Sequence, residues 1–255
     1  MKKRIANISS VGIIFRAANP AEIFIEVKDD THPIKLVRRQ LCPIGGNWIG
    51  DNAKNDRDTF DTFKREVEEE ISFDRPIRDS VELNLLGASE ANAFVPAPAS
   101  DIKAQPEDSE TLSQIKKVIF SSAAAFGDFL NTVTRAALYA ADPDNEREGF
   151  TTLASYWMVS LREDIWKDLR RLQKRFKNLS NESITLFTSL GQIICNNIKV
   201  AFAHDRVLQR FFLAHGLRGA DNMPLVPGLK SEGVGMPLQS YQEYLKRYEV
   251  AKKPI

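Results

Sequence analysis

Residues 62–73, TFKREVEEEISF, place carboxylates and apolar side chains on adjacent sides of one expected helix. At about 100° per residue, Glu66, Glu69 and Glu70 fall within an arc of roughly 100°. The neighbouring arc holds the apolar residues Phe60, Phe63, Val67 and Ile71. Like charges three or four residues apart destabilise an isolated helix by about 0.2–0.5 kcal/mol per pair. The cluster is therefore expected either on a solvated face or around a hard cation such as Mg²⁺, which prefers oxygen ligands.

A glycine pair, Gly45 and Gly46, lies upstream of this helix in the sequence IKLVRRQLCPIGGNW. The apolar and basic run at residues 33–39 predicts a strand. Pro43 and the two glycines then predict a turn. The order of elements is therefore expected to be strand, turn and helix.

This unit resembles the Nudix box, the signature of the Nudix hydrolase family. The box reads glycine, five residues, glutamate, seven residues, and then Arg-Glu-apolar-x-Glu-Glu-x-Gly-apolar. The second half matches at Arg65, Glu66, Val67, Glu69, Glu70 and Phe73. Ser72 stands where the family has its last glycine.

The first half of the box departs from the family pattern. The expected glutamate falls at Asn52 when counted from Gly46, and at Arg57 when counted back from Arg65. Neither position holds a glutamate, so residues 48–58 are interpreted as an enlarged loop.

The resemblance implies an α/β fold in which a mixed β-sheet is sandwiched between α-helices. It implies Mg²⁺ or Mn²⁺ as the cofactor, with Glu66, Glu69, Glu70 and the carbonyl of Gly46 as ligands. The family arginine, here Arg65, pairs with a glutamate and does not touch the metal. Because Arg65 and Glu69 are also spaced i,i+4, a plain surface ion pair is the alternative for these two residues.

The general base and the substrate contacts have no fixed positions in the family. Glu182, just before the expected strand ITLFTSL, is our candidate for the base, and a solvated loop glutamate is the alternative. Arg38 and Arg39 precede the glycines, and one of them is expected to donate two hydrogen bonds to a substrate phosphate.

Composition narrows the class of protein. The chain has 255 residues, 43% of them hydrophobic, which is enough for a packed core without disulfides. A net charge of +1 argues against an extended nucleic-acid surface. The chain shows no N-terminal signal and no apolar run long enough for a membrane, so we expect a cytoplasmic protein with Cys42 and Cys195 as free thiols.

One domain spanning residues 1–255 is expected, with an insertion at residues 91–150 after the box. Its first part, 91–111, is rich in Ala, Pro, Asp and Ser and is read as a loop. Strands are predicted at 9–16, 22–27, 80–88, 115–120, 153–161 and 181–190. Helices are predicted at 127–141, 162–179, 192–202 and 205–217.

Three functions remain open from the sequence. The first is a metal-dependent hydrolase that cleaves the pyrophosphate linkage of a nucleoside diphosphate joined to another group. The second is an inactive Nudix-like module that senses a nucleotide, and the third is an unrelated α/β protein with a chance run of glutamates. The intact glutamates Glu66, Glu69 and Glu70 favour the hydrolase, since binding alone gives no reason for a clustered negative charge. The partner is then a small nucleotide, and a homodimer is compatible with the family.

Overall fold

The computed structural model describes residues 3–5, 7–32, 37–48, 56–73, 81–82, 94–95, 102–133, 150–180, 183–195, 198–217, 231–235 and 248–250. Within these ranges the strands are β1 (Lys3–Ile5), β2 (Asn7–Arg16), β3 (Asn19–Val27), β4 (Leu41–Cys42), β5 (Ile44–Asn47), β6 (Val81–Glu82), β7 (Phe94–Val95), β8 (Ala123–Val133), β9 (Phe150–Leu161), β10 (Ile184–Ser189), β11 (Ser231–Gly235) and β12 (Tyr248–Val250). The helices are α1 (Thr59–Glu70), α2 (Pro106–Ser122), α4 (Glu163–Phe176), α5 (Leu190–Cys195) and α6 (His204–Ala214), with a 3₁₀ turn at Ala201–Ala203.

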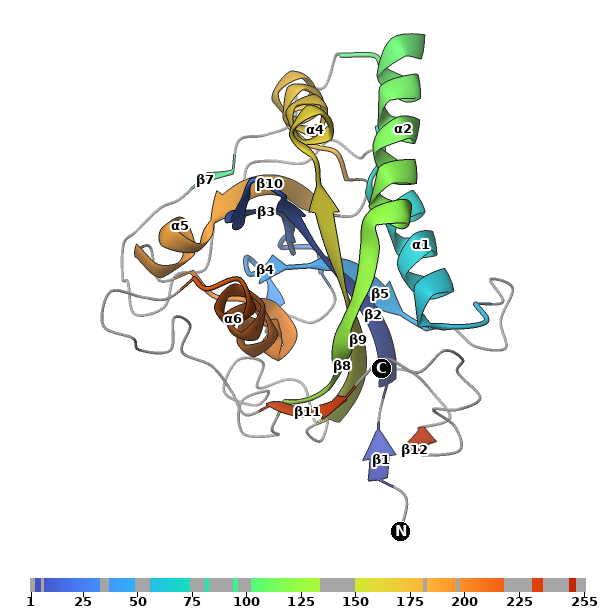
Figure 1. Ribbon diagram of the computed structural model, residues 1–255, viewed down its shortest axis with the longest axis vertical. Helices are drawn as coiled ribbons and strands as arrows, with labels where there is room; N and C mark the ends of the chain where they lie inside the picture. Colours follow the sequence, from blue (N-terminus) through green and yellow to red (C-terminus); the bar gives the residue numbers. More distant parts are fainter. Residues whose placement is uncertain are drawn as a thin grey trace.

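A mixed sheet forms the centre of the molecule (Figure 1). Its main path runs β10-β3-β2-β9-β8-β11. The β2 and β9 strands are parallel, and the other neighbours on this path are antiparallel. The strand β2 has two partners along one edge, because its residues Ser9–Gly12 pair with β5 and its residues Ile14–Arg16 pair with β3. β4 pairs with the far end of β3, so β4 and β5 lie where β2 and β3 diverge.

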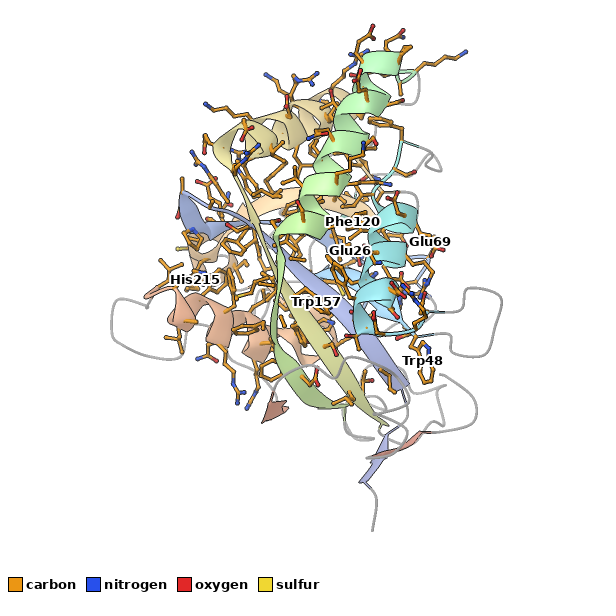
Figure 2. The ribbon with its side chains drawn as sticks, turned by 45° about the vertical axis from the view of Figure 1, so that its right-hand side comes forward. Glu26, Trp48, Glu69, Phe120, Trp157 and His215 are labelled. Carbon is orange, nitrogen blue, oxygen red and sulfur yellow. The ribbon has the colours of Figure 1, made fainter. Side chains whose placement is uncertain are left out.

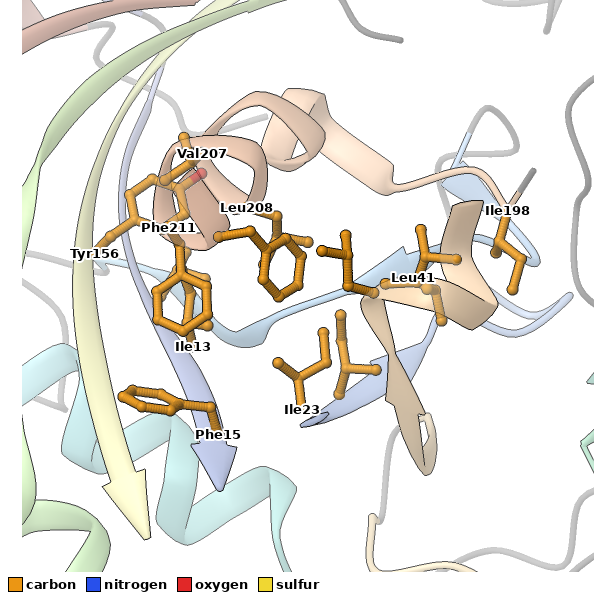
Figure 3. Packing of buried hydrophobic residues seen from close by; sticks show 14 of the residues in the cluster. Ile13, Phe15, Ile23, Leu41, Tyr156, Ile198, Val207, Leu208 and Phe211 are labelled. Carbon is orange, nitrogen blue, oxygen red and sulfur yellow. The ribbon is translucent and has the colours of Figure 1, made fainter. Parts of the chain in front are cut away.

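Helices cover both faces of this sheet because the strands alternate their apolar side chains. Ile14 of β2 and Phe24 of β3 pack with α1, α2 and α4 on one face, where α1 and α2 lie next to each other (Figure 2). Ile13 and Ile23 point to the other face and pack with α5 and α6 (Figure 3). The predicted α/β fold, a mixed sheet sandwiched between helices, is therefore confirmed.

Several predicted elements are confirmed. The strands expected at 9–16, 22–27, 153–161 and 181–190 correspond to β2, β3, β9 and β10. The helices expected at 162–179 and 205–217 correspond to α4 and α6. Asp58 caps α1, since its Oδ1 accepts a hydrogen bond from the Asp61 backbone N–H at 2.7 Å. Of the strand expected at 80–88, the structure describes Val81–Glu82 as β6, and residues 83–88 lie outside the described ranges.

Other predicted elements are wrong. The expected strand 115–120 lies inside α2, which begins at Pro106 and so also replaces the end of the predicted loop 91–111. Pro106 suits the first turn of a helix, and the Asp108 carboxylate accepts a hydrogen bond from the Gln105 N–H. Residues 127–133 of the expected helix 127–141 belong to β8, because pairing with β9 along its whole length overrides the helical spacing. The rest of that helix lies outside the described residues.

Two further corrections concern shorter segments. Of the expected strand 33–39, the structure describes 37–39 as a turn, in which Arg39 has a φ of 60°. The expected helix 192–202 is shorter, since α5 ends at Cys195. The single domain at 1–255 with an insertion at 91–150 stays a prediction. Within that segment, Leu112, Ile115 and Ile119 of α2 are buried in the core on the α1 face of the sheet.

The two cysteines differ in accessibility, which leads to a testable prediction. Cys42 is buried in β4 and Cys195 is exposed at the end of α5, and both are free thiols. Burial raises the pKa of the Cys42 thiol and so suppresses its reactive thiolate. We expect a thiol reagent to titrate one cysteine in the native protein and both after denaturation without reductant. Two thiols reacting at the same rate in the native protein would contradict the burial of Cys42.

Among the helices that the structure describes, none is long and apolar enough to cross a membrane.

Candidate active site on the glutamate-rich helix

Hydrogen bonds and close packing fix α1 to the sheet. The Ser10 hydroxyl of β2 donates to the Thr59 carbonyl at 2.5 Å, and Trp157 Nε1 of β9 donates to the same hydroxyl at 3.0 Å. Phe63 of α1 lies so close to Gly12 of β2 that a Cβ there would sit 2.3 Å from its ring. These contacts hold the first half of α1 on β2, and α1 also packs along β5.

Glu66 lies directly on Gly46 of β5. A Cβ at Gly46 would sit 2.4 Å from the carboxylate carbon of Glu66, so only glycine leaves room for this carboxylate. Gly45 and Gly46 were predicted to form a turn, and that prediction is wrong, since both pair with β2 as part of a strand. Gly46 is thus required by the close approach of the Glu66 side chain, and Gly45 is required by its backbone φ of 152°.

Arg65 is surrounded by oxygen atoms. Its guanidinium contacts Asp56 at 2.9 Å, Glu66 at 2.5 Å and Glu69 at 3.1 Å, and it donates to the Asn47 carbonyl at 2.8 Å. Burial lowers the pKa of Arg65, but the hydrogen bonds that it donates to Asp56 and the charge of Glu66 outweigh burial and raise the pKa above its usual value. Arg65 therefore stays charged and ties Glu66 to the end of β5.

Asp56 is a site residue that the sequence reasoning missed. It is the buried ion-pair partner of Arg65, and its side chain is 5% exposed. The available signal was its place next to Arg57, the position at which the count back from Arg65 ends. A pattern that specifies residue type and position does not single out an aspartate one residue away.

Glu70 sits one turn further along α1 and is held from two sides. Its Oε2 accepts a hydrogen bond from the Gly45 backbone N–H at 3.1 Å, and its Oε1 lies 3.6 Å from Lys28 Nζ. Lys28 also forms an ion pair with Glu26. Burial alone lowers the pKa of Lys28, but the charges of Glu26 and Glu70 raise it well above its usual value. Glu70 therefore belongs to a buried group of alternating charges.

The carboxylates of α1 differ in exposure. Glu66 and Glu70 are buried against β5, whereas the Glu69 side chain is 35% exposed and pairs with Arg65. Figure 2 shows Glu69 on the outer side of α1 and Glu26 on the side of the sheet. Within the described ranges, no group of three or more His, Cys, Asp or Glu side chains is arranged to hold a metal ion.

The donor set nevertheless fits one particular kind of metal site. Mg²⁺ is commonly bound by one or two carboxylates together with substrate phosphates. Glu66 and Glu70 supply two buried carboxylates over adjacent residues of one strand. The residues present fit a cation shared with a phosphate ligand better than an all-protein cage. Gly46 and Glu69 as further ligands stay predictions.

The remaining predicted residues lie apart from α1 or outside the described ranges. Arg38 Nε donates to the His32 carbonyl at 2.7 Å, and Arg39 forms an exposed ion pair with Asp30 at 2.8 Å. Their contact with a substrate stays a prediction. Glu182 lies outside the described residues, but its neighbour Ser183 donates a hydrogen bond to Glu26 Oε2. Ser183, directly before β10, thereby contacts the same group of charges.

The two glycines of β5 lead to opposite predictions for alanine variants. In Gly46→Ala the new methyl meets the end of a flexible side chain, so Glu66 shifts and the fold stays intact. We expect the hydrolase activity predicted from the sequence to fall about 10- to 100-fold, with a stability change of about 1 kcal/mol or less. In Gly45→Ala the methyl would meet the Ser10 backbone oxygen at 2.2 Å, at a φ of 152°. This variant should lose about 2 kcal/mol or more of unfolding free energy. Urea denaturation and steady-state kinetics of both variants test the contrast, which fails if Gly46→Ala is the less stable of the two.

The sequence comparisons with known proteins find nothing, and the structural likeness is weak. No protein-family model matches the sequence, and no curated protein matches it. A solved structure of a Nudix hydrolase from Alicyclobacillus acidocaldarius is similar at a TM-score of 0.36 and 10% sequence identity. The match covers 77% of this chain and 86% of that chain. A similarity this low carries no argument about activity, which has to be inferred from the motif and from the geometry around α1.

Proposed function

We propose that this protein is a Nudix-type hydrolase that cleaves the pyrophosphate linkage of a nucleoside diphosphate joined to another group, with Mg²⁺ or Mn²⁺ as cofactor. The observation that carries the proposal is the placement of two motif glutamates, Glu66 and Glu70, on the adjacent glycines of β5. A solvated glutamate run gives no reason for this arrangement, since solvated carboxylates do not need glycines beneath them or a buried arginine beside them.

The chemistry of diphosphate cleavage sets the roles of these residues. Cleavage requires that charge on the phosphate oxygens be neutralised and that a water be aligned with one phosphorus atom. The divalent ion, when bound, supplies that neutralisation. Glu66 and Glu70 hold the ion in this proposal, and Arg65 keeps Glu66 in place through its ion pairs with Glu66 and Asp56.

Proton transfer and substrate binding are assigned to other segments. Glu182 is proposed as the general base that takes the proton of the attacking water. Arg38 or Arg39 is proposed to bind a substrate phosphate through paired N–H donors. The substrate is a small nucleotide, and we place the protein in the cytoplasm; a homodimer is compatible with the family.

A nucleotide sensor is the second candidate. The observation that favours it is that Glu66 and Glu70 already contact cations of the protein itself, Arg65 and Lys28. A site whose carboxylates are neutralised internally can bind a nucleotide without hydrolysing it.

The test is a panel of nucleoside diphosphate sugars, dinucleotides and nucleoside triphosphates, incubated with the protein and Mg²⁺ or Mn²⁺. Products are identified by phosphorus NMR, and binding is measured by calorimetry on the same panel. Metal-dependent formation of a nucleoside monophosphate supports the hydrolase. Tight binding without product supports the sensor, and neither binding nor product leaves the unrelated α/β protein. Glu68→Gln serves as the control variant, since the Glu68 side chain is 56% exposed and pairs with Lys116 of α2.

A further inference from the structure

A buried lysine, Lys28, connects Glu70 of α1 to Glu26 of β3. Lys28 follows β3, and its side chain is 11% exposed. Phe24 packs on the α1 face of the sheet and Val27 on the other, so Glu26 and Lys28 continue the row of Phe24 by alternation. This row ends beside the last residue of α1, Glu70.

The Glu70 carboxylate is held through both of its oxygens. Oε2 accepts from the Gly45 amide, and Oε1 faces the Lys28 ammonium. A carboxylate held at one oxygen can still rotate about its last bond, whereas contacts at both oxygens define its plane. Lys28 therefore determines the orientation of Glu70 together with β5.

Lys28 is itself held by Glu26. Glu26 is fully buried, its Oε1 pairs with Lys28, and its Oε2 accepts from the Ser183 hydroxyl. Ser183 is in turn hydrogen-bonded to Ser180, and both bond to Asn178. The contacts thus run without a break from the loop before β10, through Glu26 and Lys28, to Glu70.

Stability alone is a poor reason for such a group. Removing two opposite charges from water costs free energy, and well-packed apolar residues often stabilise a core equally well or better. Apolar residues in place of Glu26 and Lys28 would also leave Glu70 without an orienting cation. The ion pair of Glu26 and Lys28 is better explained by its effect on the orientation of the Glu70 carboxylate.

We propose that Lys28 is a positioning residue, which is anchored by Glu26 and holds the Glu70 carboxylate against the Gly45 amide in the orientation that the site requires. This inference rests on the proposed function only for its catalytic consequence. The position of Glu70 itself can be measured without any activity.

The test uses the charge-neutral double variant Lys28→Met, Glu26→Gln. It removes one positive and one negative charge, so the net charge of the buried group is unchanged, and it retains the approximate lengths of both side chains. The matched control is Arg16→Met, Glu22→Gln, which removes another ion pair that joins β2 and β3, away from α1. Hydrogen exchange of the Gly45 amide, followed by NMR, is the first measurement, since this amide donates to Glu70.

We expect exchange of the Gly45 amide to accelerate about tenfold or more in the Lys28 double variant, while the amides of β2 and β9 keep their protection. The Arg16 double variant should leave the Gly45 amide unchanged. Unchanged exchange in the Lys28 double variant would overturn the proposal, whether or not the protein is a hydrolase. If the panel identifies a substrate, kcat should fall about tenfold or more in the Lys28 double variant at nearly constant KM. An unchanged kcat in that active enzyme would equally overturn it.

Discussion

Glu70→Gln is expected to lower kcat/KM about 100-fold or more while the protein stays folded. The reason is that glutamine keeps the volume of the side chain and an oxygen that can accept from the Gly45 amide, so α1 and β5 stay in contact. The negative charge proposed to hold the metal ion is lost, and with it the stabilisation of charge that develops on the phosphate oxygens. Steady-state kinetics with the substrate found in the panel, together with a thermal unfolding curve, measure the two effects separately.

The matched control for this prediction is Glu68→Gln on the same helix. Glu68 points away from β5, and its carboxylate contacts Lys116 Nζ of α2 at 2.7 Å. Its activity should remain close to that of the wild type. Equal losses in the two variants, or full activity in Glu70→Gln, would show that this helix does not hold the metal ion.

Arg65→Met is expected to lower the unfolding free energy by about 3–5 kcal/mol, because it removes the partner of a buried ion pair. The Arg65 side chain is 12% exposed, and that of Asp56 is 5% exposed. Without the guanidinium, Asp56 and Glu66 remain close together as carboxylates that are poorly solvated. Methionine keeps most of the apolar volume, so the loss reports the charge and the hydrogen bonds. Urea denaturation followed by circular dichroism measures the change.

Arg57→Met is the control for the effect of removing an arginine near α1. Arg57 pairs with Asp61, but its side chain is 82% exposed, so solvent screens the pair. We expect no measurable loss of stability from this variant. The interpretation of Arg65 as the buried partner of Asp56 and Glu66 would be wrong if the two arginine variants unfolded at the same urea concentration.

Local patterns in the sequence determined the elements that carry the candidate site. Asp58 before a helical repeat of Phe63 and Val67 predicts where α1 begins and which side of it is buried. The β-branched and aromatic runs at residues 9–16 and 22–27 predict the two strands β2 and β3. The clustering of Glu66, Glu69 and Glu70 on one side of α1 follows from helical geometry, and it led to the Nudix resemblance. These features depend on residues within a few positions of each other, which is why a single sequence is sufficient to predict them.

The tertiary structure decided the features that depend on residues far apart in the chain. Gly45 and Gly46 form a strand because β2 lies beside them, and residues 127–133 extend because β9 pairs with them. Asp56 reaches Arg65, and Lys28 reaches Glu70, only because the folded chain brings them together. Pairing between strands and between buried charges is set by distances in space, and no local period in the sequence encodes it. The acidic helix could therefore be predicted from the sequence. The contacts of Lys28 with Glu70 and of Asp56 with Arg65 could be identified only in the folded structure.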